Sequence, residues 1–298
     1  MGLVDVFSFL FKLIQLSLQS FVALFFPSER KSVQDQVVLI TGAGHGIGRE
    51  FALEFARLGA RTVLWDLNKE NNEATAAEIK EAGGTAYTYT CDVSKSSDIH
   101  AVAQKVRQDV GEVDILVNNA GILYGGALLD MEERHIRRTF EVNTLAHFWT
   151  VREFLPAMME KNAGHIVNIA SMSAKSGTAF LVDYSSSKFA VYGFTEALNE
   201  ELKRLGKPGV KTTVVCPMFV NTGLCMFPKD KFGKILEPKE VADVAIDGVL
   251  RNEEYVYIPR RLWVDLKIGA LLPQRVTKFL KEHGEFGIDP QYQHMKKD

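Results

Sequence analysis

Cysteine is scarce in the sequence, and neither sign of charge is in excess. The 298 residues include three cysteines, Cys91, Cys216 and Cys225, whose spacing fits neither a metal site nor a disulfide framework. The formal net charge is −2 and no zinc-finger or RNA-binding motif is present, so we expect no nucleic-acid partner. The sequence also lacks repeats of fixed period and low-complexity tracts. These absences favour a reducing, cytosol-facing location and a site without metal.

One long apolar stretch runs from residue 4 to residue 26, and Pro27 ends it. Its polar residues recur at steps of three and four, which places them on one narrow stripe of a helix. They are Asp5, Ser8, Lys12, Gln15 and Gln19. A wide apolar face with a thin polar seam suits a membrane interface, although a helix of this length would also reach across a bilayer. A buried core helix is the plainer alternative. We expect residues 1–27 to be a membrane anchor.

The residues around this stretch indicate its orientation. A signal peptide does not fit, because Asp5 stands where basic residues are usual and no small-residue cleavage site follows. Arg30 and Lys31 lie in the expected linker, residues 28–36, and would hold the next segment on the cytosolic side. We therefore expect the rest of the chain to face the cytosol.

A dinucleotide-binding opening follows the linker. Residues 36–40 form a short β-branched run, residues 41–48 read TGAGHGIG, and residues 49–60 follow a helical pattern. Glycines in such a turn let the backbone approach a pyrophosphate at the amino end of the helix. The next predicted strand, 62–65, ends in Asp66, where a carboxylate can bind the adenosine ribose, although a strand-end turn residue also fits. Because this carboxylate would repel a 2′-phosphate, we expect NAD rather than NADP.

Predicted strands and helices then alternate through residues 37–260. The strand-like runs are 86–91, 115–117, 165–170, 211–215 and 255–258, and the helical patterns are 69–81, 98–110, 132–159 and the segment that contains Tyr184. The length and the 46% share of hydrophobic residues suit one large α/β domain. We predict a doubly wound parallel sheet of the Rossmann type, with its chemistry at the carboxyl ends of the strands.

The sequence YSSSK at residues 184–188 places a tyrosine and a lysine four positions apart. On a helix, both side chains lie on the same face. A cation beside a phenol favours the ionised form, so we expect Lys188 to lower the pKa of Tyr184 and to make it a general base near neutral pH. Taken alone, the pair also fits an ordinary helix with a buried tyrosine and a solvated lysine.

In order and spacing, these motifs resemble the short-chain dehydrogenase/reductase family over about residues 37–259. The motifs are TGAGHGIG at 41–48, NNAG at 118–121, Asn143, Ser171 and YSSSK at 184–188. The chain is also similar to the membrane-associated branch that holds 17β-hydroxysteroid dehydrogenases type 11 and 13 and the epidermal-type retinol dehydrogenases. The segments that carry this likeness include RKSV at 30–33, VLWD at 63–66, TFEVN at 139–143, AHFWT at 146–150 and FVNTG at 219–223.

The resemblance implies a role for each catalytic residue. Tyr184 is the general acid/base that takes the proton of the substrate alcohol, and Lys188 lowers its pKa and binds the nicotinamide ribose. Ser171 donates a hydrogen bond to the substrate oxygen, with Ser173 as the competing serine. Asn143 holds a water that connects Lys188 to solvent, unless it is only an amide that caps a neighbour inside the helix.

The resemblance also implies a site for NAD. Asp92 should lie near the adenine, residues 119–121 under the adenosine half, and Thr222 at the carboxamide. The full expected set is Gly42, Gly46, Ile47, Gly48, Asp66, Asp92, Asn119, Ala120, Gly121, Tyr184, Lys188 and Thr222. Met218 follows Pro217 where the family usually has a glycine. The family's usual dimer implies a homodimer.

The carboxyl part of the chain combines an expected lid with an apolar, basic segment. Residues 223–237 lie where the family places its substrate lid, and four side chains suit an apolar ligand, although plain packing fits equally. They are Leu224, Met226, Phe227 and Phe232. Residues 261–298 hold an apolar helix flanked by arginines and lysines, which favours contact with an anionic membrane surface over packing on the core. From Gly284 onward the sequence is polar and turn-rich, so we expect this tail to be mobile.

We therefore predict an NAD-dependent dehydrogenase that oxidises a hydroxyl of a lipophilic substrate. A 17β-hydroxysteroid, retinol or a related lipid alcohol fits, at the surface of the endoplasmic reticulum or of lipid droplets. An NADP-dependent carbonyl reductase on the same scaffold is an alternative, which Asp66 disfavours. The other alternative is a catalytically idle lipid-droplet scaffold protein. Such a scaffold has no need of Asn143, Ser171, Tyr184 and Lys188 together.

Removal of residues 1–27 should release the protein from membranes and droplets without unfolding the domain. Each leucine- or phenylalanine-sized side chain that leaves the interface forfeits about 1.5–3 kcal/mol, and no predicted strand needs the segment. The measurement is the share of protein that floats with membranes in a density gradient. A glycosylation site engineered at the amino end tests the arrangement, since efficient glycosylation in microsomes would contradict a helix that lies in the cytosolic leaflet.

Overall fold

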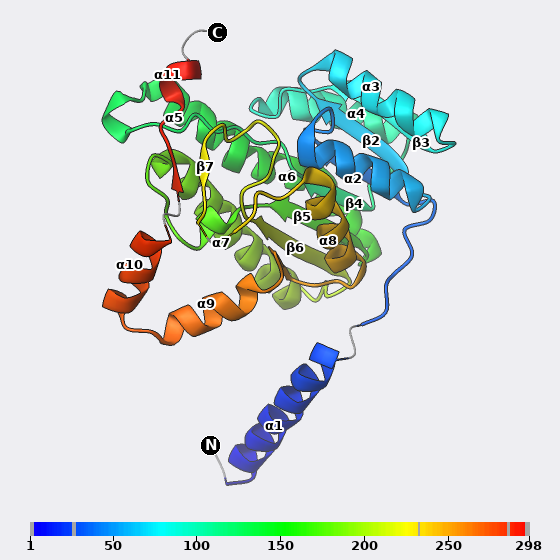
Figure 1. Ribbon diagram of the computed structural model, residues 1–298. Coiled ribbons are helices and arrows are strands. Elements are labelled where there is room, and N and C mark those ends of the chain that lie inside the picture. Colours follow the sequence, from blue (N-terminus) through cyan, green and yellow to red (C-terminus); the bar gives the residue numbers. More distant parts are fainter. Residues whose placement is uncertain (1–2, 26–27, 232, 285–286, 296–298) are drawn as a thin grey trace. The chain divides into compact units, whose positions relative to one another are not determined.

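The central sheet is built from short runs of mostly β-branched residues, two of which are buried along their whole length. In the computed structural model, which describes residues 3–25, 28–231, 233–284 and 287–295, seven such runs pair in parallel. The strands are β1 (Val37–Thr41), β2 (Arg61–Asp66), β3 (Thr85–Thr90), β4 (Ile115–Asn118), β5 (Gly164–Ile169), β6 (Val210–Pro217) and β8 (Tyr255–Ile258). Their order across the sheet is β3-β2-β1-β4-β5-β6-β8 (Figure 1). The order reverses between β1 and β4, and ligand sites of open α/β sheets lie at such a point.

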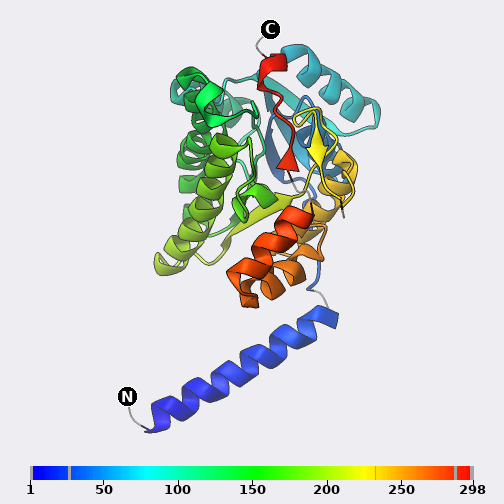
Figure 2. The same cartoon turned by 60° about the vertical axis from the view of Figure 1, so that its left-hand side comes forward.

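Helices cover both faces of this sheet (Figure 2). One layer contains α2 (Gly46–Arg57), α3 (Lys69–Glu81) and α8 (Pro238–Leu250), and the other contains α4 (Ser96–Asp109), α6 (Ala146–Lys161) and α7 (Val182–Arg204). Phe51 and Leu64 belong to the core under the first layer, and Trp65 and Phe154 to the core under the second. Leu64 and its neighbour Trp65 enter different cores because successive side chains of a strand point to opposite faces. The predicted doubly wound Rossmann sheet is confirmed.

The helical stretch around Asn143 differs from the prediction of one helix over residues 132–159. Helix α5 (Glu133–Phe140) passes into a π-helical turn, Glu141–Leu145, before α6 begins at Ala146. The predicted helical extent is confirmed, but the π turn was not predicted, because the apolar pattern of the sequence indicates helix and not the local number of residues per turn. Asn143 lies in the middle of the π turn, and such turns are often found at functional sites.

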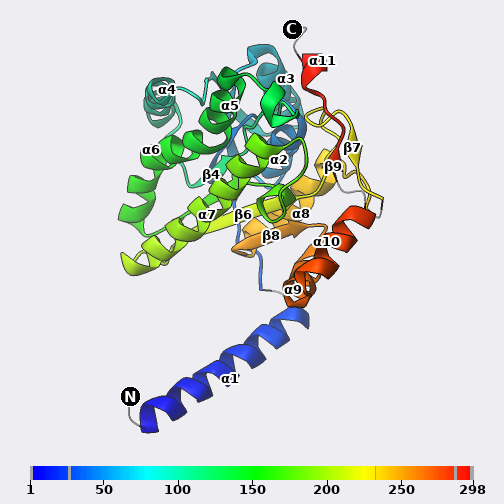
Figure 3. The same cartoon turned by 90° about the vertical axis from the view of Figure 1, so that its left-hand side faces the viewer.

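The carboxyl part of the chain also departs from expectation. Instead of one helix there are two, α9 (Leu262–Leu271) and α10 (Gln274–His283), separated at Pro273. Beyond them β9 (Gly287–Ile288) pairs antiparallel with β7 (Pro228–Lys229), and a short helix, α11 (Tyr292–Met295), follows (Figure 3). Ile288, Gln291 and Tyr292 are buried. The expectation of a mobile tail is therefore wrong for these residues, because they pack on the domain.

The amino end forms a helix of its own, α1 (Leu3–Phe25), and the chain divides into two compact units at residues 1–32 and 33–298. Apolar side chains of α1 are exposed, with Phe7 at 70% and Phe11 at 72%. The expected helix end at Pro27 lies outside the described residues. Within the described part of the chain, no helix combines the length and the apolar character needed to cross a membrane.

Candidate active site

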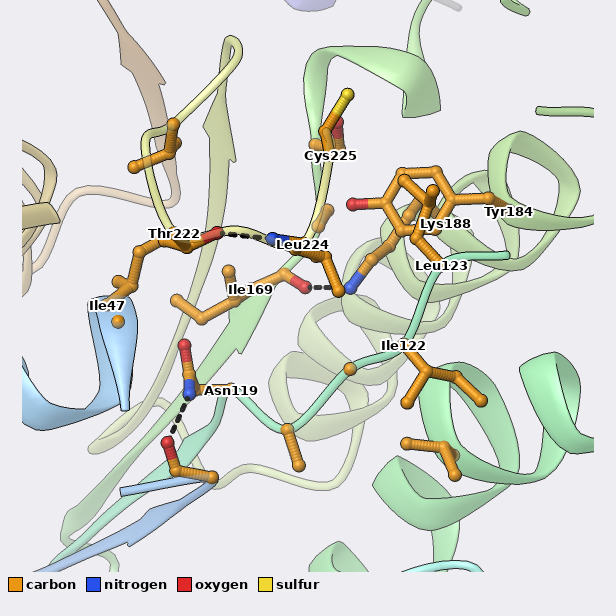
Figure 4. A pocket seen from close by; sticks show the side chains of 18 of the residues that line it. Ile47, Asn119, Ile122, Leu123, Ile169, Tyr184, Lys188, Thr222, Leu224 and Cys225 are labelled. Atoms are coloured by element: carbon orange, nitrogen blue, oxygen red, sulfur yellow. Dashed lines mark hydrogen bonds between the residues drawn. The ribbon is translucent and has the colours of Figure 1, made fainter. Parts of the chain in front are cut away.

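A cavity of about 400 Å³ lies at the carboxyl ends of the central strands (Figure 4). Twelve of the predicted site residues line it. They are Gly42, Gly46, Ile47, Asp66, Asp92, Asn119, Ala120, Gly121, Ser171, Tyr184, Lys188 and Thr222. The other two, Gly48 and Asn143, are buried and do not line the cavity. The fold therefore gathers residues that are up to 180 positions apart in the sequence around one space.

The glycine turn after β1 forms the wall where α2 begins. Gly42 and Gly46 have positive φ angles of 66° and 55°, which glycine adopts without strain. A Cβ on Gly48 would lie 2.0 Å from the carbonyl oxygen of Gly42, so a larger residue would force the helix away from the turn. Asn119 ties the turn to the end of β4, because its Nδ2 donates to the carbonyl oxygens of Thr41 (2.9 Å) and Gly42 (3.2 Å). A helix amino end held in this way favours a phosphate group.

Asp66, at the end of β2, lines the cavity and also braces the glycine turn. Its Oδ2 accepts a hydrogen bond from the Gly44 N–H (2.8 Å), and its Oδ1 accepts one from the Asn68 N–H (2.8 Å). The carboxylate is thus fixed beside the turn that would hold a pyrophosphate. Its negative charge suits ribose hydroxyl donors and would repel a phosphate on the same ribose.

Asp92 lines the cavity together with Arg138, a residue that the sequence analysis missed. Nη2 of Arg138 lies 3.0 and 3.2 Å from the two carboxylate oxygens of Asp92, and the Ser94 hydroxyl donates to the same carboxylate (2.7 Å). Burial raises the pKa of Asp92, but the hydrogen bonds from Ser94 and Arg138 outweigh burial and bring the pKa below its ordinary value. No local motif marks Arg138, because it lies 46 positions from Asp92 in the chain.

The Tyr184–Lys188 pair lies on one face of α7, as the spacing predicts. Both side chains are buried, and Nζ of Lys188 is 5.7 Å from the centre of the Tyr184 ring. Ser171, which follows β5, lines the cavity beside Tyr184 and lowers the pKa of its hydroxyl. The competing serine, Ser173, has a supporting position, since its N–H donates to Oγ of Ser171 (3.1 Å).

Burial dominates the ionisation of both groups. It raises the pKa of Tyr184 to about 12, although the neighbouring Ser171 lowers that pKa. It lowers the pKa of Lys188 to about 8. The expectation that Lys188 brings the pKa of Tyr184 below its ordinary value is therefore wrong for the protein by itself, because the desolvation of a buried phenolate outweighs its favourable contacts.

Lys188 and Asn143 both lie beside Gly121, which follows β4. Nζ of Lys188 donates to the carbonyl oxygen of Ile169 (2.8 Å) (Figure 4). The Asn143 amide accepts from the Ile122 N–H (2.8 Å) and donates to the Ile122 carbonyl oxygen (2.9 Å) and to Oγ of Ser187 (3.1 Å). In this arrangement Asn143 holds the loop after β4 to α7. Its expected contact with a water stays a prediction.

Beyond Tyr184 the cavity is apolar. Leu123, Leu181 and Ile288 form a buried cluster with Tyr184, and Phe219 and Cys225 pack against it. These residues come from distant loops and from the carboxyl end, so no sequence motif gathers them. Except for Ile288, which packs in the same cluster, they line the substrate end of the cavity together with Leu224.

The four side chains expected to contact an apolar ligand have different positions. Leu224 lines the cavity. Met226 and Phe227 are 48% and 39% exposed and do not line it. Phe232 lies outside the described residues. The cavity wall is therefore formed by the first part of the expected lid, with Cys225 in place of the larger residues.

Comparisons with known proteins place these features in context. The family model of the short chain dehydrogenase matches residues 36–231. The chain is 48% identical to estradiol 17-beta-dehydrogenase 11 of Pongo abelii, over 94% of this chain and 93% of that protein. It is 44% identical to 17-beta-hydroxysteroid dehydrogenase 13 of Homo sapiens, over 93% of both chains.

Two solved structures share the fold. A short-chain dehydrogenase/reductase from Burkholderia phymatum in complex with NAD has a TM-score of 0.73 and 28% identity, and the match covers 79% of this chain and 93% of that one. A metagenomic short-chain oxidoreductase in complex with NADP has a TM-score of 0.65 and 33% identity, over 76% and 96% of the two chains. Because this fold holds either cofactor, the choice between them depends on individual residues such as Asp66.

Substitution Asp66→Ala should weaken NAD binding and reduce the preference for NAD over NADP. Loss of hydrogen bonds to a charged group should raise the dissociation constant of NAD about tenfold, and the loss of negative charge should favour NADP. The measurement is a pair of calorimetric titrations with NAD and NADP. Glu73→Ala, on the exposed side of α3, is the matched control and should change neither. A wild-type protein that already prefers NADP would contradict the role given to Asp66.

Proposed function

The chain belongs to the short-chain dehydrogenase/reductase family of oxidoreductases, and we propose that it oxidises a hydroxyl group of a lipophilic alcohol with NAD as the acceptor. One observation carries this proposal. A buried tyrosine, which shares one cavity with Ser171 and is close to the buried Lys188, stands between a glycine turn suited to a phosphate and an apolar cluster suited to a lipid.

The residues at the polar end of the cavity fit a nicotinamide dinucleotide. The glycine turn of residues 42–48 would hold the pyrophosphate, Asp66 the adenosine ribose, and Thr222 the nicotinamide end. Gly46 and Thr222 are close neighbours, since a Cβ on Gly46 would lie 3.0 Å from Cγ2 of Thr222. When bound, NAD supplies the acceptor for the hydride that leaves the alcohol carbon. The choice of NAD over NADP is supported by the carboxylate of Asp66.

Tyr184 has the position of the general base. An alcohol oxygen must lose its proton as the hydride departs, and the Tyr184 hydroxyl, once ionised, can accept that proton. Ser171 can donate a hydrogen bond to the same oxygen and stabilise its partial negative charge. The ammonium of Lys188 favours the phenolate electrostatically, while burial excludes water that would otherwise compete for these hydrogen bonds.

The apolar end of the cavity supports a lipid alcohol as substrate. Leu123, Leu181 and Leu224 line the cavity on the side of Tyr184 and offer carbon surface to a ligand. The similar proteins are named for 17β-hydroxysteroids, and estradiol is therefore the first substrate to test. Retinol and related lipid alcohols have the same combination of one hydroxyl and a large apolar body.

The proposed location is the cytosolic face of the endoplasmic reticulum and of lipid droplets. Helix α1 exposes Phe7, Phe9 and Phe11, which suit burial in a lipid monolayer. Helices α9 and α10 also expose apolar side chains, among them Leu271 at 86% and Phe279 at 62%, in a segment that carries arginines and lysines. A lipid surface would both retain the enzyme and concentrate its substrate. The homodimer stays a prediction.

Replacement of Tyr184 by phenylalanine should abolish turnover and leave NAD binding intact, because only the acid/base hydroxyl is lost. We expect kcat for estradiol or retinol to fall by a factor of about 10²–10⁴, measured as NADH absorbance with detergent-held protein. Tyr192→Phe is the control on the same helix, since that hydroxyl binds Tyr257 (3.2 Å) away from the cavity. A Tyr184 variant that keeps more than a tenth of the activity would exclude this assignment. A wild type active only with NADPH and ketones would favour the carbonyl reductase.

The rate of oxidation should depend on pH through both buried groups. Burial holds the pKa of Tyr184 near 12, so its ionised fraction grows by about tenfold per pH unit below that value. The pKa of Lys188 is lowered to about 8, so its favourable charge is lost above that pH. We expect kcat/KM for alcohol oxidation to rise between pH 6 and pH 8 and to flatten above pH 8. A flat profile below pH 8 would contradict this account.

A further inference from the structure

The carboxyl end of the chain packs against the loops that line the apolar half of the cavity. Strand β9 pairs with β7, with Ile288 opposite Pro228 and Gly287 opposite Lys229 (Figure 3). The Asp289 N–H continues the contact by donating to the carbonyl oxygen of Phe227 (3.2 Å). Residues 287–292, which we term the C-terminal strap, thus run along residues 224–229, in the first half of the expected substrate lid.

Gln291 binds two loops from the C-terminal strap, and it is fully buried. Its backbone N–H donates to the carbonyl oxygen of Gly125 (2.8 Å). Its side-chain Oε1 accepts from the Met226 N–H (2.8 Å), and its Nε2 donates to the carbonyl oxygen of Leu224 (3.1 Å). One residue therefore satisfies backbone groups of two separate loops.

These bonds fix the two loops at the positions where they form the cavity wall. Leu224 and Cys225 line the cavity, and the Gln291 amide binds the backbone on either side of Cys225. Leu123, on the opposite loop, also lines the cavity and lies two residues before Gly125. An amide side chain offers a donor on its nitrogen and an acceptor on its oxygen, and glutamine reaches further than asparagine.

Two glycines make room for the C-terminal strap. A Cβ on Gly125 would lie 2.9 Å from Cγ of Gln291 and 2.9 Å from Cδ1 of Ile288, and a Cβ on Gly126 would lie 2.7 Å from Cβ of Tyr292. Gly125 also has a positive φ of 66°. The loop after β4 is therefore shaped to receive these three residues of the C-terminal strap at close range.

The remaining contacts link the C-terminal strap to the catalytic tyrosine and to α5. Ile288 is 4% exposed and belongs to the apolar cluster that contains Tyr184. The Tyr292 hydroxyl accepts from the Glu132 N–H (3.0 Å) and is 2.8 Å from Nδ1 of His135. The C-terminal strap is thus held at both ends, with Gln291 between them.

We infer that the C-terminal strap sets the shape of the substrate pocket, with Gln291 as a positioning residue and Ile288 packed in one cluster with the lining residues Leu123 and Leu181. This inference rests on the proposed oxidation of a lipid alcohol at the same site. The hydrogen bonds of Gln291 keep the loops of Leu123 and Cys225 at a fixed separation. The pocket can then enclose the large apolar body of the substrate while the substrate hydroxyl reaches Tyr184. Without these bonds the lid would open and the apolar substrate would lose part of its contact surface.

Amide hydrogen exchange on the full chain tests the inference without any substrate. In Gln291→Ala, amides of residues 224–227 should exchange about tenfold faster, because the bonds that hold this segment are gone. Gln293→Ala is the matched control, since Gln293 is exposed on the same segment, and it should leave the exchange unchanged. Equal exchange in wild type and Gln291→Ala would overturn the inference.

Kinetics provide the functional measurement, with estradiol and NAD as the probes. Gln291→Ala should raise KM for estradiol about tenfold, with kcat changed by less than a factor of three and the dissociation constant of NAD unchanged. An equal loss in both kinetic constants together with weaker NAD binding would indicate general damage to the fold and would overturn the positioning role. If the wild type oxidises no alcohol with either cofactor, the proposed function fails, while the exchange measurement still decides the inference.

A second variant disturbs the C-terminal strap from the opposite loop, so that the inference can be tested even if Gln291→Ala does not fold. Gly126→Ala leaves the Gln291 side chain intact and places a methyl group against Tyr292. It should accelerate exchange in residues 224–227 and raise KM for estradiol in the same direction as Gln291→Ala. A Gly126→Ala protein that is stable and unchanged in both measurements would contradict the inference.

Discussion

The buried ammonium of Lys188 is the constraint on which the site depends. The side chain is 3% exposed, and in the described part of the chain no carboxylate forms an ion pair with it. Withdrawal of an ammonium from water costs several kcal/mol, and the bond to the Ile169 carbonyl offsets only part of that cost. A position of this kind stabilises a negative charge that forms beside it. The phenolate of Tyr184 is the group placed to provide that charge.

The surroundings of Lys188 are polar but neutral, which preserves this effect. Burial, together with the nearby charge of Lys188, lowers the pKa of His147 to about 3, so the imidazole stays uncharged. His147 Nδ1 lies 3.0 Å from Oδ1 of Asn168, which also accepts from Nδ2 of Asn118 (3.0 Å). This amide network connects β4, β5 and α6 directly behind the cavity. It fixes the strand ends without adding an anion that would compete for the ammonium.

Local motifs of the sequence were sufficient for much of the fold and for the polar half of the site. The helix over residues 69–81 and the strand over residues 255–258 match their predicted bounds, because Gly83 and Gly84 follow the helix and Pro259 follows the strand. The glycine turn and the Tyr184–Lys188 pair were recognisable since their residues are close in sequence. The apolar half of the site was not recognisable from the sequence. Its parts meet only through tertiary packing, and the two-residue strand β9 is too short to leave a pattern.

The pKa of Tyr184 shows a further limit of sequence reasoning. The spacing of Tyr184 and Lys188 correctly placed the two groups on one face, but the sign of the resulting pKa shift depends on burial, which spacing does not reveal. The π turn at residues 141–145 has a similar origin. It adds one residue to a helical turn, and the apolar pattern on either side stays consistent with an uninterrupted helix.

That added residue has a consequence for how the chain tolerates change. One residue corresponds to about 100° of rotation in an α-helix. Helix α5 contacts its partners through Arg138, bound to Asp92, and through Thr139, whose Oγ1 donates to Asp183 (2.8 Å), while α6 contacts the amide network through His147. Deletion of a single position between residues 141 and 145 would turn one set of contacts away from its partners even though every contacting side chain remained. At this place the length of the chain is under stronger constraint than the identity of most of its residues.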